Sequence, residues 1–161
     1  MKREEGQTLI EILLGVGIAA AIITAIAAVV ISALNNATFR KNQNLATSYA
    51  QQGMEVVRAI RDRSWTDFSL LDGWMCLPQN STTLTPRVGL DCDGEGNVGI
   101  FIREIRMQLN QSDCTASVVN TKVTVAVKWS DSKCTSPPPF NYCQEVKLIS
   151  CLTKINAVGA P

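Results

Sequence analysis

A glutamate at the start of a long apolar stretch is the first residue of this 161-residue chain with a clear potential for chemistry. Glu11 closes the sequence Gly6-Gln7-Thr8-Leu9-Ile10-Glu11, and the apolar stretch follows it. An ionisable side chain in such a segment is costly and is read as functional, the alternative being a carboxylate tolerated at a membrane interface. The chain has no histidine, which removes the commonest general base and most mixed zinc sites. We therefore expect no enzyme activity and no cofactor.

Six cysteines form the second set of reactive side chains, and all of them follow the apolar stretch: Cys76, Cys92, Cys114, Cys134, Cys143 and Cys151. An even number of cysteines in a small extracytoplasmic domain indicates structural disulfides and an oxidising compartment. No C-x-x-C pair occurs, so the spacing favours neither a thioredoxin-type redox pair nor a zinc ribbon.

A short acidic loop is the third set. Oxygen-bearing side chains occupy every second position around glycines, at Asp91, Asp93, Glu95 and Asn97. This spacing superficially resembles a calcium loop, but the distal glutamate of an EF-hand would fall at Ile102. An ordinary Gly/Asp turn is favoured, and these four residues remain a weak calcium candidate in a chain for which we predict no metal.

The element that carries Glu11 is predicted to cross a membrane. Residues 12–31 are apolar except for Thr24, and about 20 such residues span a bilayer as a helix. The apolar core of a cleaved secretory signal is shorter, about 7–15 residues. Basic residues nearly balance on the two sides, so the cysteines decide the orientation and place the C-terminal part outside. With 46% hydrophobic and 18% charged residues, the chain is not disordered.

These N-terminal features resemble the class III signal of the type IV pilin family: a short charged leader ending in glycine, a glutamate five residues later and a long apolar helix. The resemblance implies that a prepilin peptidase cuts after Gly6 and that Gln7 becomes the methylated N-terminus. It assigns Glu11 to neutralising the N-terminal amine of a neighbouring subunit. Gln7 departs from the family, in which phenylalanine is usual, and the helix lacks the proline of many major pilins.

The resemblance implies a structural subunit of a bacterial type IV pilus-like filament (fimbrium), and the departures favour a minor pilin or pseudopilin. The implied partners are other pilin or pseudopilin subunits, the prepilin peptidase/N-methyltransferase, the pilus assembly platform and, before assembly, membrane lipid. The chain would lie in the cytoplasmic membrane as a single-pass protein and then enter an extracytoplasmic pilus or pseudopilus. Two alternatives stay open: a membrane-anchored receptor or adhesin domain, and a pseudopilin of a type II secretion or DNA-uptake machine.

The rest of the chain is predicted to have an α+β fold. Apolar residues at steps of three and four continue the helix to about residue 64, with Gly53 in the buried stripe for close approach of a sheet. That helix would be about 87 Å long. Strands are expected at 99–109, 121–129 and 145–153, as an antiparallel meander. The expected organisation is leader 1–6, membrane and assembly helix 7–34, amphipathic helix 35–64, connecting loop region 65–97 with a short hairpin, and sheet domain 98–161. This is the order of elements in the pilin fold.

Six cysteines allow many pairings. In an up-down-up meander, two cysteines bracket the second connection, and the cysteine of the first connection lies near the end of the third strand. This layout predicts the pairs Cys76–Cys92, Cys114–Cys151 and Cys134–Cys143.

Five basic residues of the predicted strands were candidates for a cluster on the solvent face of the sheet: Arg103, Arg106, Lys122, Lys128 and Lys147. The chain has a net charge of only +1, and a solvated face that discourages edge pairing explains these residues equally well. Nucleic acid is therefore not the expected partner.

Overall fold

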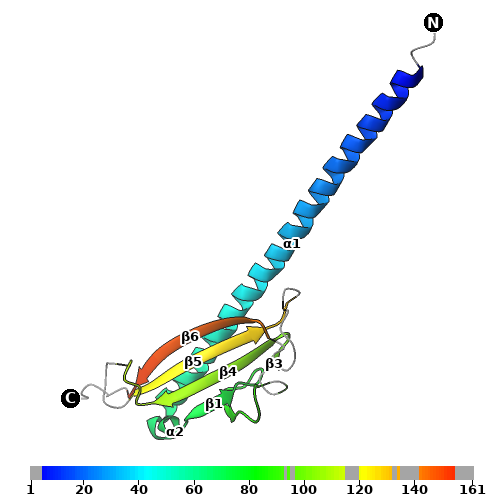
Figure 1. The fold of residues 1–161 in the computed structure, drawn as a ribbon. Coiled ribbons are helices and arrows are strands. Elements are labelled where there is room, and N and C mark those ends of the chain that lie inside the picture. Colours follow the sequence, from blue (N-terminus) through cyan, green and yellow to red (C-terminus); the bar gives the residue numbers. More distant parts are fainter. Residues whose placement is uncertain are drawn as a thin grey trace. The chain divides into compact units, whose positions relative to one another are not determined.

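A computed structural model describes residues 5–92, 94, 97–114, 120–131, 134 and 142–154, and side chains are described from Leu9 onward. The chain divides into two compact units, Met1–Lys41 and Asn42–Pro161. Eight elements follow one another along it (Figure 1): α1 (Glu5–Arg63), α2 (Trp65–Ser69), β1 (Gly73–Cys76), β2 (Thr85–Pro86), β3 (Asn97–Val98), β4 (Phe101–Leu109), β5 (Asn120–Trp129) and β6 (Gln144–Thr153).

Helix α1 contains 59 residues and contributes to both units. In the first unit its apolar side chains from Leu9 to Leu34 are exposed. The hydroxyl of Thr24 donates a hydrogen bond to the carbonyl of Ala21 at 2.9 Å, so this polar group is satisfied within the helix. By its length and composition, this helix could cross a membrane. Its bounds agree with the helix expected over 7–64.

In the second unit α1 packs on the sheet through a stripe of small and apolar residues. Ala46, Ala50 and Val57 are fully buried, as the steps of three and four predict. A Cβ atom added to Gly53 would lie 2.9 Å from Cγ1 of Val125 on β5. Gly53 therefore permits the close approach of helix and sheet that its position in the buried stripe predicts.

The three long strands form the predicted antiparallel meander. Strand β4 pairs with β5 from Phe101↔Trp129 to Leu109↔Thr121, and β5 pairs with β6 from Asn120↔Thr153 to Trp129↔Gln144. Val123, Val125 and Val127 on β5 are fully buried and share the face that meets α1, which we call the inner face. The alternate residues of each strand form the outer face.

The region 65–97 contains the short hairpin expected there, formed by β1 and β2, and it has more regular structure than a connecting loop region. It contains α2, β1, β2 and β3, and the sheet order is β2-β1-β4-β5-β6, with β3 also paired to β4. The sheet therefore begins at residue 73 rather than 98, and β1 lies beside β4 in antiparallel register. These strands have only two to four residues, too few for an alternation of apolar and polar side chains to be recognised.

All six cysteines form disulfides, and the pairs are those predicted from the meander: Cys76–Cys92, Cys114–Cys151 and Cys134–Cys143. The bridges span 16, 37 and 9 residues. Each such crosslink contributes on the order of 2–4 kcal/mol, chiefly by restricting the unfolded chain. The second unit is thus held together by three covalent bridges as well as by its core.

Candidate functional site

Two regions carry functional side chains, and the first is the N-terminal part of α1. Gly6 and Gln7 have helical backbone, and Glu11 is exposed among apolar neighbours. Glu11 is the sole ionisable residue between Leu9 and Phe39. Among the described residues it has no ion-pair partner. A carboxylate in an apolar layer needs a cation nearby, so Glu11 is available to a charge from outside this chain.

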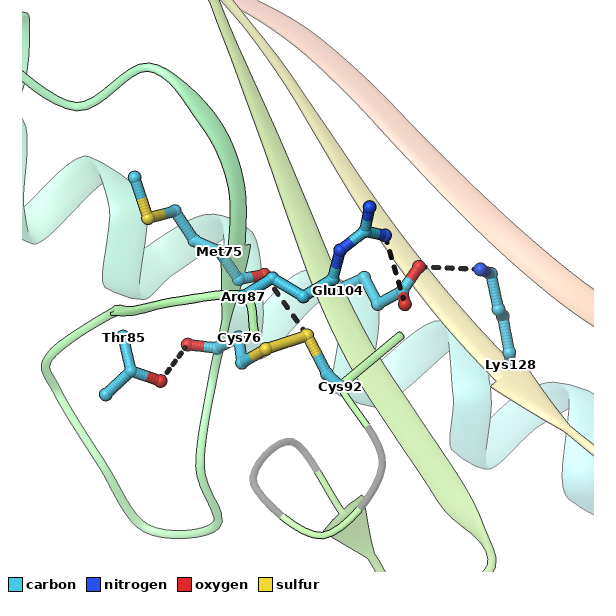
Figure 2. Close-up of a disulfide and its surroundings, with 7 residues drawn as sticks. All are labelled: Met75, Cys76, Thr85, Arg87, Cys92, Glu104 and Lys128. Carbon is cyan, nitrogen blue, oxygen red and sulfur yellow. Dashed lines mark hydrogen bonds and ion pairs between the residues drawn. A yellow bond between two sulfur atoms is a disulfide. The ribbon is translucent and has the colours of Figure 1, made fainter. Parts of the chain in front are cut away.

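The second region lies on the outer face of the sheet, around a buried carboxylate (Figure 2). Glu104 on β4 is fully buried. Its Oε2 accepts a hydrogen bond from Nζ of Lys128 at 2.6 Å, and its Oε1 lies 3.7 Å from Nη1 of Arg87. Two cations from different segments thus compensate one buried anion, which a buried carboxylate requires.

The Cys76–Cys92 disulfide borders this carboxylate, because Cys76 on β1 is the register partner of Glu104. The disulfide packs against Ile102 on the outer face, with Tyr142 at the edge of the cluster. The hydroxyl of Thr85 donates to the carbonyl of Cys76 at 3.4 Å. These contacts join Thr85 to β1 and place Cys92 against the outer face.

A tryptophan and two arginines extend this region toward Gly73, where β1 begins. The guanidinium carbons of Arg87 and Arg106 lie 4.4 and 5.3 Å from the centroid of the Trp74 ring, within the range of a cation–π contact. Trp74 is 37% exposed. Trp74 lies on the outer face because it alternates with the inward Met75, and Leu70, which precedes β1, is 76% exposed.

Arg103 does not lie on the solvent face of the sheet, where the sequence made it a candidate for a basic cluster. Its register partner is the inward Val127, so its side chain lies on the inner face, where it is 5% exposed. Its Nη2 donates to the carbonyl of Pro78 at 2.6 Å. Burial lowers the pKa of the Arg103 guanidinium, and the electrostatic interaction with Tyr49 opposes that effect.

The other four cations lie on the outer face, and three of them are paired with acids. Lys122 contacts Asp113, Lys128 contacts Glu104, and Lys147 contacts Glu145. The hydrogen bond from Lys122 lowers the pKa of the Asp113 carboxyl. Arg106 differs from the three lysines, because among the described residues it has no acidic partner. The outer face is therefore a mixed surface with one uncompensated guanidinium, and not the continuous basic patch that duplex DNA favours.

The calcium candidate is only partly described. Asp91 precedes Cys92 in a loop and Asn97 begins β3, whereas Asp93 and Glu95 lie outside the described residues. The calcium hypothesis therefore stays a prediction. Within the described part of the chain, one other group has metal-ligand spacing: Asp131, Cys134 and Cys143. Both sulfurs belong to a disulfide, so they offer no thiolate to a metal.

The outer-face region was missed by sequence reasoning. Glu104 and Lys128 are 24 residues apart, and only the strand register brings them together. Arg87 and Trp74 belong to the region 65–97, for which the sequence predicts a connecting loop region. The one signal in the sequence is a glutamate within the strand predicted at 99–109, because a buried carboxylate requires a partner, but the sequence does not identify that partner.

In comparisons with protein-family models, with curated proteins and with solved structures, the chain has no match. The functional assignment therefore depends on the residues and geometry of this chain.

Proposed function

We propose that this protein is a minor pilin or pseudopilin, a non-catalytic structural subunit of a type IV pilus-like filament that is cleaved after Gly6. The observation that carries the proposal is the composition of α1. From Leu9 to Leu34 it is an exposed apolar helix with a single carboxylate, Glu11, and its last part packs on a disulfide-bonded sheet. A helix that is apolar on all faces needs lipid or other helices around it.

Cleavage after Gly6 would remove the charged leader and create an α-amine at Gln7, four residues before Glu11. In a bundle of such helices, the amine of one subunit would pair with Glu11 of the next. Each charge would then satisfy the other in an apolar layer, where both are costly alone. This pairing gives the subunits a defined axial register.

Two further observations support the proposal, one on helix packing and one on the compartment of the second unit. An added Cβ atom at Gly15 or Gly17 would meet nothing within 4 Å in the single chain, so both positions leave the helix surface open. Small residues at such positions let neighbouring helix backbones approach closely. The three disulfides support placement of the second unit in an oxidising compartment.

The test is the intact mass of the protein produced with and without an active prepilin peptidase. We expect loss of residues 1–6 and addition of one methyl group at Gln7. A Gly6→Val variant, which places a branched side chain at the cleavage position, is the matched control and is expected to keep its full mass.

An unprocessed wild-type chain, in cells whose peptidase cleaves a reference prepilin, would contradict the proposal. The membrane-anchored receptor or adhesin would then become the leading function. Loss of ammonia at Gln7 after cleavage would show cyclisation of the N-terminal glutamine, which removes the amine charge and would rule out its pairing with Glu11.

A further inference from the structure

We propose that the outer face of the sheet holds a binding site for a carboxylate-bearing sugar, with Arg106 as its anion-binding residue. The site lies in the second unit, and the inference does not depend on the filament function. It is formed where β1 begins and β4 ends, in a pocket of about 320 Å³. A pocket of this size is at the lower end of the range for small-ligand sites. Its lining includes Asp72, Gly73, Trp74, Arg106, Gln108 and Gln111.

Backbone geometry keeps this pocket open. Gly73 has φ = +92°, a conformation that favours glycine, and an added Cβ atom there would meet nothing within 4 Å. The next residue, Trp74, is the register partner of Arg106 on the outer face. The pocket therefore has a wall without a side chain next to an indole and a guanidinium.

Arg106 is held in a way that leaves its donors free. Its guanidinium carbon lies over the Trp74 ring, 5.3 Å from the ring centroid, which is within cation–π range, and among the described residues the guanidinium donates no hydrogen bond. Arg106 is exposed and, within the described part of the chain, pairs with no acid. A carboxylate can accept two parallel hydrogen bonds from such a guanidinium. Arg106 thus has both the charge and the geometry to bind one.

The remaining lining suits hydroxyl groups. Nε2 of Gln111 donates to the carbonyl of Leu109 at 3.0 Å, which fixes the amide and leaves its Oε1 as an acceptor. Gln108 adds a second amide and Asp72 adds a carboxylate, so the pocket offers both donors and acceptors. The exposed part of Trp74 provides an apolar surface for sugar C–H groups. One carboxylate surrounded by hydroxyls, as in a uronic acid, matches this set.

The charges of the outer face disfavour a nucleic acid. The three lysines of the outer face are already paired with acids, so a phosphate backbone would find few free charges.

The test is isothermal titration of the full chain in detergent micelles with a galacturonic acid trimer. We expect binding by the wild type, at least tenfold weaker binding by Arg106→Ala, and an intermediate loss for Arg106→Lys, which keeps the charge but not the fork of donors. Arg58→Ala is the matched control, because Arg58 is an exposed arginine paired with Glu55 on α1. It is expected to bind within about twofold of the wild type.

A second variant keeps the test valid if the Arg106 variants unfold. Gln108→Glu leaves the Trp74 stack in place and adds a negative charge to the pocket, so it is expected to weaken binding of the trimer while the thermal unfolding temperature stays near that of the wild type. Absence of wild-type binding would overturn the proposal, and so would equal binding of neutral maltotriose or of inorganic sulfate. Binding of duplex DNA that is lost in Arg106→Ala would overturn it in favour of a nucleic-acid surface.

Discussion

Glu104 shows how strongly single residues of the outer face depend on one another. The carboxylate is fully buried, whereas Lys128 and Arg87 reach it from partly exposed positions. The burial of a charge is tolerable only while its partners remain. The Lys128 interaction is therefore important because its loss would leave a charge that solvent cannot reach.

Lys128→Met is expected to lower the free energy of unfolding by about 2–4 kcal/mol, since it leaves Glu104 incompletely compensated. Combining it with Glu104→Leu should restore much of that loss. Urea denaturation of the full chain in detergent measures both. Lys147→Met is the control: its pair with Glu145 is exposed, and such a pair is worth less than about 1 kcal/mol. Equal losses for the two lysines would show that Glu104 does not depend on its ion pair.

Asp113 gives a prediction about pH. The hydrogen bond from Lys122 lowers the pKa of this carboxyl in the folded protein. Because the folded value lies below the unfolded one, the stabilising contribution is present at neutral pH and is lost as the pH falls through the folded pKa. Lys122→Gln is expected to raise the Asp113 pKa toward its ordinary range, as followed by carboxyl NMR titration. An unchanged titration curve would refute the assigned cause, and Lys147→Gln, on the same face, should leave that curve unchanged.

At the scale of the elements, the contact between α1 and the sheet depends on one missing side chain. Helices ordinarily disfavour glycine by about 1 kcal/mol relative to alanine. Among the described glycines, Gly53 is nevertheless the one where an added Cβ atom would lie closest to another side chain, that of Val125. Close packing of helix and strand thus outweighs helix propensity at this position.

Gly53→Ala is expected to destabilise the protein by about 1 kcal/mol, because the overpacking cost of about 1–3 kcal/mol exceeds the gain in helix propensity. Val125→Ala makes room for the new methyl group. The double variant should therefore be more stable than the sum of the two single changes predicts, a coupling that a double-mutant cycle from chemical denaturation measures. Strict additivity would show that the added methyl group meets no resistance from Val125.

At the scale of the whole molecule, the two units have different surfaces. The first contains an apolar helical segment, from Leu9 to Leu34, in which Glu11 is the one acid. The second is an α+β domain with a buried core, paired surface charges and three disulfides. The apolar exterior of the first unit suits lipid or neighbouring helices, and the paired surface charges of the second suit water.

Glu11→Leu is expected to leave the proposed cleavage after Gly6 intact, since Glu11 lies five residues beyond that glycine, and to abolish incorporation into filaments. The readouts are intact mass and the amount of the chain in sheared filaments, in cells that contain its assembly machinery. Thr24→Val is the control, because Thr24 is the one polar side chain of residues 12–31 and is satisfied within the helix. This variant should still be incorporated. Normal incorporation of Glu11→Leu would remove the proposed role of the carboxylate.

The sequence by itself determined the elements whose signals are local and long. The continuous apolar run, the steps of three and four around Val57 and the alternation along β5 each repeat over many residues, so α1 and the three long strands could be predicted. The order of those strands then restricted the disulfides to the observed pairs. Gly53 was correctly interpreted because it interrupts an otherwise regular buried stripe.

The tertiary structure alone decided which distant residues meet. Strands β1, β2 and β3 are too short to have a recognisable period, and their hydrogen bonds to longer strands create them. Strand register turned Arg103 inward and placed Lys128 beside Glu104. A shift of one residue along a strand reverses the face of every side chain. The outer-face pocket around Arg106 therefore depends on pairing between strands, which no local pattern in the chain encodes.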